Sequence, residues 1–374
     1  MGNPWGGSEE LWSQTALNLV RQGVSVSASV TGYSTLHPRV QYLIQAGVEI
    51  WPRAWVYSLR KRLWRKVAFR RDSYLVAEVQ RLLDRKRPSL VLFSSGDAIS
   101  QVELLELCVA RNLPFVTIGQ ANRETWWPAD EEAERYRNVL AAAMRCYFVS
   151  RANWLLFEKQ IGCKLSNAEV VRNPFNVKFD ASVPWPKTVD GELLFACVGR
   201  LDPIAKGQDI ILEALATRAW MDRKWRLTLY GQGPMRNSLE RLVQQLGLKS
   251  RVIFAGHVAV VEDIWATNHV LVMPSRFEGL PLAMVEAMLC GRLAIATDVA
   301  GHSELIEDGT NGFLAEAATV PSMAKALERF WVRRTDMEHM GRAAREKIRQ
   351  IIPADPVGEF TEKIKAFIAS PDRS

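Results

Sequence analysis

Short apolar segments alternate with segments of helical periodicity along most of the chain. Continuous apolar runs predict strands in the first half, near residues 24–30, 48–51, 90–93, 115–118 and 146–149. Apolar positions at steps of three and four predict intervening helices, for example over residues 73–85 and 99–111. Because strands and helices alternate in this way in parallel sheets, we expect the first half to be an α/β unit.

A second α/β series occupies the rest of the chain. Its strands are predicted near residues 193–198, 227–230, 252–254, 270–273 and 293–296. Repeated prolines separate the two series over residues 173–190, where they remove amide donors and restrict the preceding residues. We therefore expect an N-terminal domain over residues 1–175, a linker over 176–190, a C-terminal domain over 191–350 and a last helical segment over 351–374 that returns to the N-terminal domain.

Length and composition agree with this organisation. The chain has 374 residues, enough for two domains that each bury a core. A hydrophobic content of 48% with 24% charged residues excludes wholesale disorder. The five cysteines are scattered and form no CxxC pair, which excludes a zinc ribbon and a disulfide scaffold and fits reduced thiols in a cytosol. We therefore expect a cytoplasmic protein.

The charge of the chain is concentrated in one segment. Eight basic residues and no acid lie from Arg53 to Arg71, and they account for more than the whole net charge of +7. The remainder is nearly neutral, which argues against a general nucleic-acid binder. Apolar residues recur here at helical spacing, so the segment suits a helix on the anionic inner face of a membrane. The alternative is a solvated helix that packs its apolar stripe on its own domain.

The densest group of candidate functional residues follows the strand predicted near residues 270–273. Glu278 lies at the carboxyl end of that strand, where open α/β sheets bind ligands. Gly279 and Leu280 are expected to present free amides at the start of the next helix, which binds anions. Glu286, further along that helix, can reach the same crevice. Two carboxylates beside an anion site suit a sugar nucleotide. The alternative is that Glu278 only caps the helix and that Glu286 is a solvated helix residue.

Two more loops carry candidate residues at strand ends. Arg200 and Lys206 follow the strand over residues 193–198 and provide the two cations that a diphosphate leaving group needs. The alternative is an ordinary solvated loop. Gly231 lies in a Gly-Gln-Gly turn that lacks the third glycine of a dinucleotide fingerprint. We interpret it as a turn approaching a ligand, with a simple turn as the alternative.

Together these motifs resemble a known enzyme family. Glu278 and Glu286 form the E-x7-E element of retaining glycosyltransferases of the GT-B fold, in the large family typified by sucrose synthases and bacterial polysaccharide mannosyl or glucosyl transferases. The resemblance covers nearly the whole second half, and its other elements are Val198-Gly199-Arg200, Gly256-His257-Val258, Pro274-Ser275, Gly279-Leu280-Pro281-Leu282, Ala287-Met288, Gly301-His302-Ser303-Glu304-Leu305 and Asn311-Gly312-Phe313. It implies two Rossmann-like, doubly wound α/β domains that face a cleft.

The resemblance also implies a role for each residue. Glu278 would contact the donor sugar near the reacting carbon, while Arg200 and Lys206 would stabilise the departing diphosphate. Glu286 would hold the ribose hydroxyls. The remaining donor-binding positions would be Gly231 and the backbone of Gly279, Leu280, Pro281 and Leu282. No cofactor and no metal are implied, because two fixed cations replace the metal and the substrate is itself a UDP- or GDP-linked sugar.

The acceptor side is expected in the first domain. Gly6 and Gly7 look like the glycine-rich N-terminal loop of the family, followed by a helix over residues 10–21 with Ser8 as its N-cap. Gln120 and Asn122 occupy the region where members often carry a histidine, and an amide can orient a sugar hydroxyl without exchanging a proton. The fold places a central strand before the glycine loop. We therefore expect a first strand to be missing from this sequence, which is clipped by about ten residues, and strand edges to be left unpaired.

These features favour one function over its alternatives. The expected activity is retaining, metal-independent transfer of a hexosyl group from a nucleotide sugar to an acceptor hydroxyl. The acceptor is expected to be a glycan, a glycolipid or an exopolysaccharide, in keeping with a basic segment that meets a membrane surface. The alternatives are a sugar-nucleotide epimerase on the same fold, and a clipped or inactive homologue that binds sugar nucleotides or a partner protein.

Overall fold

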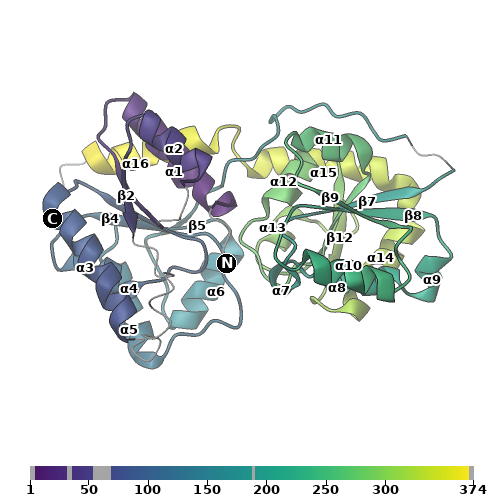
Figure 1. The fold of residues 1–374 in the computed structure, drawn as a ribbon, viewed down its shortest axis with the longest axis horizontal. Coiled ribbons are helices and arrows are strands. Elements are labelled where there is room, and N and C mark those ends of the chain that lie inside the picture. The colour runs from purple at the N-terminus through teal and green to yellow at the C-terminus, as the bar shows by residue number, and fades with distance from the viewer. Residues whose placement is uncertain (1–4, 32–35, 54–68, 188–189, 370–374) are drawn as a thin grey trace.

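The computed structural model shows two lobes side by side, joined by an extended connection and by the C-terminal helices (Figure 1). It describes residues 5–31, 36–53, 69–187 and 190–369. Most of the basic segment from Arg53 to Arg71 lies outside the described residues, so its predicted helix stays a prediction. No helix in the described ranges is both long and apolar enough to cross a membrane.

The first lobe contains two separate parallel sheets. The smaller sheet pairs β1 (Ser27–Thr31) with β2 (Glu49–Arg53). The larger sheet has the order β3-β4-β5-β6, from β3 (Val91–Ser95), β4 (Phe115–Gly119), β5 (Arg145–Phe148) and β6 (Ala168–Val170). Within the described residues, β1 pairs only with β2 and β3 only with β4. The described strands of this lobe thus form two separate sheets.

Helices pack on the smaller sheet and cover both faces of the larger one. They are α1 (Gly7–Arg21), α2 (Pro38–Gln45), α3 (Phe69–Lys86), α4 (Val102–Val109), α5 (Asp130–Ala141) and α6 (Arg151–Ile161). On one face, Leu11 and Leu19 of α1 pack on Val116 and Ile118 of β4. On the other face, buried residues of α3 to α6 form a second cluster with β4 and β5. Each face of the sheet is therefore a hydrophobic core in its own right.

The second lobe is a single six-stranded parallel sheet with the order β12-β11-β10-β7-β8-β9. Its strands are β7 (Leu193–Val198), β8 (Trp225–Tyr230), β9 (Val252–Gly256), β10 (Val270–Met273), β11 (Leu293–Thr297) and β12 (Gly312–Ala315). The strand order reverses next to β7, so the loops after β7 and β10 diverge there and leave room for a ligand. This reversal places Arg200, Lys206 and Glu278 at the ligand-binding edge of the sheet.

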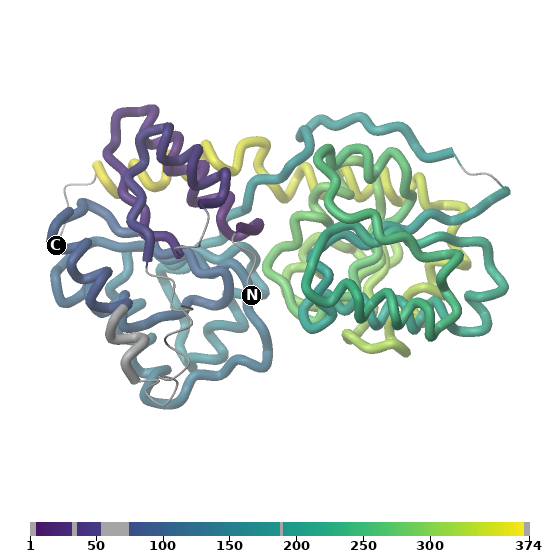
Figure 2. Tube along the Cα trace, viewed as in Figure 1, coloured from purple at the N-terminus to yellow at the C-terminus, as the bar shows by residue number. Residues whose placement is uncertain are grey.

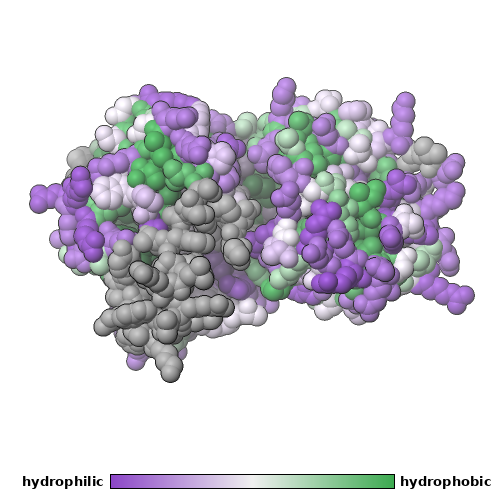
Figure 3. Space-filling model, viewed as in Figure 1, coloured by the Kyte–Doolittle hydropathy of each residue, from purple (hydrophilic) through white to green (hydrophobic). Residues whose placement is uncertain are grey.

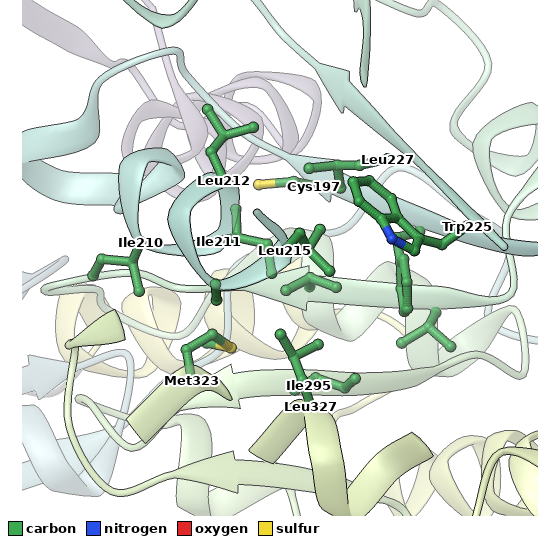
Figure 4. Packing of buried hydrophobic residues seen from close by; sticks show 14 of the residues in the cluster. Cys197, Ile210, Ile211, Leu212, Leu215, Trp225, Leu227, Ile295, Met323 and Leu327 are labelled. Carbon is green, nitrogen blue, oxygen red and sulfur yellow. The ribbon is translucent and has the colours of Figure 1, made fainter. Parts of the chain in front are cut away.

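Two layers of helices enclose this sheet. They are α7 (Pro203–Lys206), α8 (Gln208–Leu215), α9 (Arg218–Met221), α10 (Arg236–Gln245), α11 (Val261–Thr267), α12 (Leu282–Leu289), α13 (His302–Leu305), α14 (Val320–Val332) and α15 (Met337–Ile351). On one face Ile211, Leu215 and Leu327 pack against Leu227 and Ile295 (Figure 4). A second cluster, built around α12, fills the other face. The two cores are close-packed, which holds the strand ends in fixed positions.

The connection between the lobes runs in both directions. Between β6 and β7 the described residues form no helix or strand, and the chain crosses there from the first lobe to the second. The final helix α16 (Pro356–Ala369) returns to the first lobe and packs on α1, as the chain trace shows (Figure 2). Phe360 of α16 lies edge-on to Tyr147 of β5, with ring centroids 5.2 Å apart. The C-terminal segment is therefore part of the first lobe's core.

Several local expectations need correction. The strands β6 and β12 are not among the predicted ones, because each has only three or four residues. The first helix begins at Gly7, and its N-cap is Gly6 instead of Ser8. Glu9 replaces the expected hydroxyl cap, because its carboxylate accepts the Gly6 amide at 2.9 Å. The helix predicted from residue 99 starts only at Val102.

Candidate active site

The loop after β10 carries the carboxylate at the centre of the site. Glu278 Oε1 accepts two hydrogen bonds, from Lys206 Nζ at 2.6 Å and from Ser275 Oγ at 2.8 Å. The lysine comes from α7, which follows β7, and β7 and β10 are neighbours in the sheet. Parallel strands end at the same edge, so two residues 72 positions apart meet there. The predicted neighbourhood of Glu278 and Lys206 is present.

The electrostatic balance at Glu278 favours the carboxylate. Burial acts to raise the pKa of Glu278, but Lys206, His302 and the Ser275 hydroxyl together outweigh it and hold the pKa below its ordinary value. The side chain of Glu278 is only 8% exposed. Its second oxygen, Oε2, has no hydrogen-bond partner in the described parts of the chain. Glu278 is thus an ionised acceptor with one oxygen left for a ligand.

A hydrogen-bonded column supports this carboxylate from beneath. Ser275, which donates to Glu278, receives a 2.6 Å hydrogen bond on its carbonyl from Thr297 Oγ1. The Thr297 carbonyl in turn lies 2.6 Å from Nδ1 of His302 and accepts its proton. His302 is fully buried, and burial lowers its pKa. These hydrogen bonds link β11 and α13 to the loop that carries Glu278 and hold that loop in position.

The backbone beside Glu278 is free to bind an anion or a sugar. Among the described residues, the amides of Gly279 and Leu280 donate to no protein acceptor. Gly279 packs so closely on the first lobe that a Cβ there would collide with the carbonyl of Gln120. A side chain at position 279 would therefore push the two lobes apart. Helix α12 starts at Leu282 with Pro281 as its N-cap.

Glu286 is buried against the linker between the lobes. Both the backbone amide and the side-chain amide of Asn176 donate to Glu286 Oε1, each at 2.9 Å. Burial raises the pKa of Glu286, while these two hydrogen bonds act to lower it. The alternative of a solvated helix residue is therefore wrong. Glu286 Oε2 has no hydrogen-bond partner among the described residues, so it is open to a ligand hydroxyl.

Arg200 and Gly231 lie on adjoining loops of the same edge. Arg200 is half-exposed, and its guanidinium is 2.6 Å from Asp202 Oδ2. Gly231 has φ +125°, and a Cβ there would collide with the carbonyl of Gly199. Only glycine allows this close approach of the loops after β7 and β8. Within the described residues Arg200 forms no ion pair with Glu278 and pairs with Asp202 instead.

The first lobe touches the site mainly through its backbone and buried amides. Asn122 pairs with Glu278 in an isolated antiparallel bridge. Its side chain bonds Gln160 at 2.8 Å and the next backbone amide, so it is committed to the protein. Gln120 accepts from Asn173 at 2.7 Å, and its own side-chain nitrogen is buried without a partner. Gln120 and Asn122 therefore shape the cleft wall from inside the first lobe.

The glycine loop reaches the second lobe. A Cβ on Gly7 would lie 2.9 Å from Leu282, in the helix that follows Glu278. Gly6 precedes it in extended conformation as the N-cap of α1. Of the two glycines expected on the acceptor side, Gly7 thus approaches the start of α12, across the boundary between the lobes.

An ion pair closes the interface next to the site. Glu304 accepts the Ala152 amide at 2.9 Å and lies 3.3 Å from Arg172. Arg172 also donates to the Val149 carbonyl at 2.7 Å, so it is anchored in the first lobe. Because Glu304 belongs to α13 of the second lobe, this pair holds the two lobes together beside the Glu278 loop.

Four positions near the two carboxylates were given no role from the sequence, although Ser275 and His302 lie in motifs named above. Ser275, His302, Asn153 and Asn176 support the two carboxylates, and Asn153 does so by donating to the Glu278 carbonyl at 3.2 Å from the first lobe. Asn153 lies in α6, more than one hundred residues from Glu278. Only Ser275 carries a local signal, because it stands three residues before Glu278. His302 lies in a motif named above and contacts Thr297 within the second lobe. Asn153 and Asn176 depend on contacts with the first lobe and the linker that no short motif records.

Comparison with known proteins identifies the second lobe. Residues 192–332 match the family described as glycosyl transferases group 1. Over 143 residues the chain is 34% identical to the alpha-D-kanosaminyltransferase of Streptomyces kanamyceticus. This alignment covers 38% of the chain and 37% of the relative, so the chain spans well under two thirds of the length of this curated relative.

Solved structures resemble both lobes. The structure of Anabaena Alr3699/HepE in complex with UDP-glucose is 19% identical and superposes with a TM-score of 0.71, covering 98% of this chain and 97% of that one. Sucrose-phosphate synthase from Thermosynechococcus elongatus gives 0.69 at 17% identity, covering 96% and 92%. These likenesses establish the fold as GT-B. Residues 192–332 thus match a group 1 glycosyltransferase domain, and the chain as a whole has the GT-B fold.

Proposed function

We propose that the protein is a retaining glycosyltransferase that moves a hexosyl group from a nucleotide sugar to an acceptor hydroxyl. The observation that carries this proposal is the pairing of Glu278 with Lys206 at the edge of a group 1 glycosyltransferase domain. One oxygen of the carboxylate is held by protein donors and the other is open. The ionised Glu278 carboxylate can accept a sugar hydroxyl through its open oxygen, and the free backbone amides beside it can bind a diphosphate.

In the proposed reaction the second lobe binds the donor and the cleft admits the acceptor. Glu278 accepts a sugar hydroxyl, and Glu286 accepts the ribose hydroxyls through its open oxygen. Lys206 and Arg200 face the diphosphate and stabilise the negative charge that grows as the bond between the anomeric carbon and the phosphate oxygen breaks. The acceptor hydroxyl oxygen attacks the anomeric carbon from the same face that the diphosphate leaves. The departing phosphate oxygen takes the proton of that hydroxyl. No separate general base is then needed.

We propose that the two cations do this work without a metal ion. Within the described chain, no group of three histidine, cysteine, aspartate or glutamate side chains is arranged to hold a metal. Lys206 is fixed by Glu278, while Arg200 is half-exposed and can move toward a phosphate. Activity is expected to survive chelation of divalent ions, and its loss on treatment with EDTA would contradict this part of the proposal.

The acceptor is proposed to be a glycan, glycolipid or exopolysaccharide chain. The basic segment from Arg53 to Arg71 would bring the enzyme to an anionic membrane that carries such an acceptor. Co-sedimentation with vesicles of anionic and of zwitterionic phospholipid tests this step. Salt-sensitive binding to the anionic vesicles alone is expected, and equal or absent binding at low salt would contradict it.

The donor is tested directly by ligand-dependent stability. A nucleotide sugar that binds only the folded protein raises its melting temperature by mass action. We expect a response to UDP- or GDP-linked hexoses, at a lower concentration than to the free nucleoside diphosphate. No response to any member of a nucleotide-sugar panel would contradict the proposed function.

A further inference from the structure

A pocket lies where the chain crosses twice between the lobes. The first crossing is the linker after β6, and the second joins α15 to α16 beside it (Figure 1). The pocket has a volume of about 590 Å³ and is lined by Pro174, Phe175, Val177 and Phe179 of the first crossing and by residues 354–357 of the second. Small-molecule sites have volumes of about 300–1,000 Å³. None of the candidate active-site residues lines this pocket, so it is a separate site.

The first lobe contributes one face of each of two helices to the pocket. The lining residues of α1 are spaced by three and four positions and therefore share one helix face: Gln14, Leu17, Asn18 and Arg21. Arg39 and Tyr42 line the pocket from α2 and also have helical spacing. The two faces meet, because Nη2 of Arg21 lies 3.4 Å from the Tyr42 hydroxyl. Each helix thus brings one arginine to the pocket.

Both arginines are available to an anionic ligand. Among the described residues Arg21 forms no ion pair, and its side chain contacts only Asn18 and Tyr42, each at 3.4 Å. Arg39 Nε lies 3.7 Å from Glu10 Oε1, which is beyond hydrogen-bond distance, and the two oxygens of Glu10 already accept from two other side chains. Guanidinium groups bind phosphate through paired hydrogen bonds, so two of them at one pocket favour a phosphorylated ligand.

The one acid among the described lining residues is occupied by the backbone. Asp355 precedes α16, and its Oδ1 accepts the amide of Gly358 at 2.8 Å. Its carbonyl accepts the amide of Glu359 at 3.1 Å. Asp355 is thus the N-cap of α16, and its negative charge faces the positive end of the helix. The pocket therefore keeps an excess of positive charge, from two arginines against one capping acid.

Aromatic side chains form another part of the wall. Phe175 and Phe179 of the linker pack together, with ring centroids 6.4 Å apart, and Tyr42 lines the pocket from the first lobe. Such a surface packs on the body of an organic ligand, while the arginines bind its anionic group. We propose that this pocket binds an organic phosphate. The phosphoryl group pairs with Arg21 and Arg39, and the apolar or aromatic body of the ligand packs against these three rings.

The linker connects this pocket to Glu286. Phe175 and Val177 line the pocket, whereas Asn176 between them donates twice to Glu286. A ligand in the pocket therefore orders the linker segment that holds Glu286. Both the binding and this ordering are independent of the donor chemistry proposed for Glu286.

Titration calorimetry on the whole chain tests the binding, with phenyl phosphate as the probe. Inorganic phosphate and phenol represent the two halves of that probe. We expect phenyl phosphate to bind at least about fivefold more tightly than inorganic phosphate, because its ring buries apolar surface, and phenol to bind more weakly than both. Arg21→Gln and Arg39→Gln should each weaken phenyl phosphate binding about tenfold. Arg81→Gln, at an exposed position on α3 of the same lobe, is the matched control and should bind as the parent does.

Hydrogen exchange locates the bound probe. With phenyl phosphate the amides of residues 175–179 should exchange at least about threefold more slowly in the parent, and this protection should be absent in Arg21→Gln. Equal affinity of Arg21→Gln and Arg81→Gln for phenyl phosphate would overturn the proposal, as would unchanged exchange of residues 175–179 or affinity for phenyl phosphate no greater than for inorganic phosphate. Binding that is lost in Lys206→Met and kept in Arg21→Gln would place the probe at the diphosphate site and would also overturn it.

Discussion

Lys206 Nζ lies 2.6 Å from Glu278 Oε1, although the two residues come from different strand–helix units of the second lobe. The lysine is anchored after β7 and the glutamate after β10, and the pair spans the point at which the strand order reverses. Because the carboxylate is almost fully buried, an unpaired charge on Glu278 would be costly, and Lys206 supplies its counter-charge. The lysine therefore helps to keep the pKa of Glu278 low before any substrate arrives.

Replacing Lys206 with methionine should shift the pH dependence of the reaction. The pKa of Glu278 is held below its ordinary value by its surroundings, and removing the ammonium leaves burial to raise it. The acidic limb of the kcat/KM profile should therefore move to higher pH in Lys206→Met, and kcat should fall by about 100-fold or more as the leaving diphosphate loses a cation. Lys249→Met, at an exposed position of the same lobe, is the control. An unshifted acidic limb in Lys206→Met would show that the ion pair does not govern the charge of Glu278.

Replacing Glu286 with glutamine should stabilise the protein while weakening donor binding. The pKa of Glu286 is raised in the folded state, mainly by burial. The stabilising contribution of such a group is fully present below its unfolded pKa and is lost as pH rises through the folded value. At pH 7.5 the ionised carboxylate thus carries a cost that Glu286→Gln removes, and the glutamine oxygen can still accept from Asn176.

Thermal melts at pH 7.5 and pH 4.5 measure this effect. The variant should melt above the parent at pH 7.5, by a margin that shrinks at pH 4.5, and its affinity for the nucleotide sugar should drop about tenfold. Glu278→Gln should melt below the parent at pH 7.5, because its partner Lys206 loses a counter-charge. A lower melting temperature for Glu286→Gln at pH 7.5 would contradict the direction of the pKa shift.

Alanine substitutions at Gly207 and Gly247 distinguish the effect of backbone strain from that of a steric collision. Gly207 and Gly247 both have positive φ, +62° and +72°, so alanine is strained at either one. Only at Gly207 would the added Cβ collide with the carbonyl of Pro274, at the start of the Glu278 loop, whereas nothing lies within 4 Å at Gly247. Gly207→Ala should cost about 2 kcal/mol more stability than Gly247→Ala. It should also lower kcat by about tenfold or more, because it displaces the loop. If the two variants lose the same free energy of unfolding in urea and have the same kcat, Gly207 does not approach the Pro274 carbonyl closely.

The pair between Glu304 and Arg172 should control closure of the cleft. Glu304→Gln keeps an acceptor for the Ala152 amide and removes the charge that faces Arg172. We expect the radius of gyration from small-angle scattering to increase and KM for the donor to rise about three- to tenfold. Glu328→Gln is the matched control, because Glu328 pairs with Arg223 within the second lobe. If both variants scatter alike and have the same KM, the interface pair does not hold the lobes closed.

The sequence predicts the second lobe better than the first. Strands β7 and β10 end where the apolar runs end, because a strand buried on both faces leaves an uninterrupted apolar signal. Glu278 and Lys206 could be placed together because parallel strands share an edge. The partnership of Glu286 with Asn176 could not, since it depends on how a proline-rich linker crosses the second lobe. The assignment of Gln120 and Asn122 to the acceptor side rests on resemblance, and the structure shows their amides bonded inside the first lobe.

Hydropathy alone also says little about the surface near the cleft. Hydrophilic residues cover much of the visible face of the second lobe, with hydrophobic patches between them (Figure 3). The candidate residues differ widely in exposure: Arg200 is half-exposed, while Glu278 and Glu286 are buried. Motif spacing singled out all three as candidates. Only packing shows that Glu278 and Glu286 are each hydrogen-bonded to the protein through one carboxylate oxygen.

The most direct test of the account is transfer by the parent protein and by Glu278→Gln under single-turnover conditions. The measurement follows nucleoside diphosphate release and the glycosylated acceptor from the nucleotide sugar that most stabilises the protein. The account predicts that the parent forms product with the anomeric configuration of the donor. It also predicts that Glu278→Gln is at least about 100-fold slower while binding the free nucleoside diphosphate with similar affinity. Equal rates for the two proteins, or a product of inverted configuration, would contradict it.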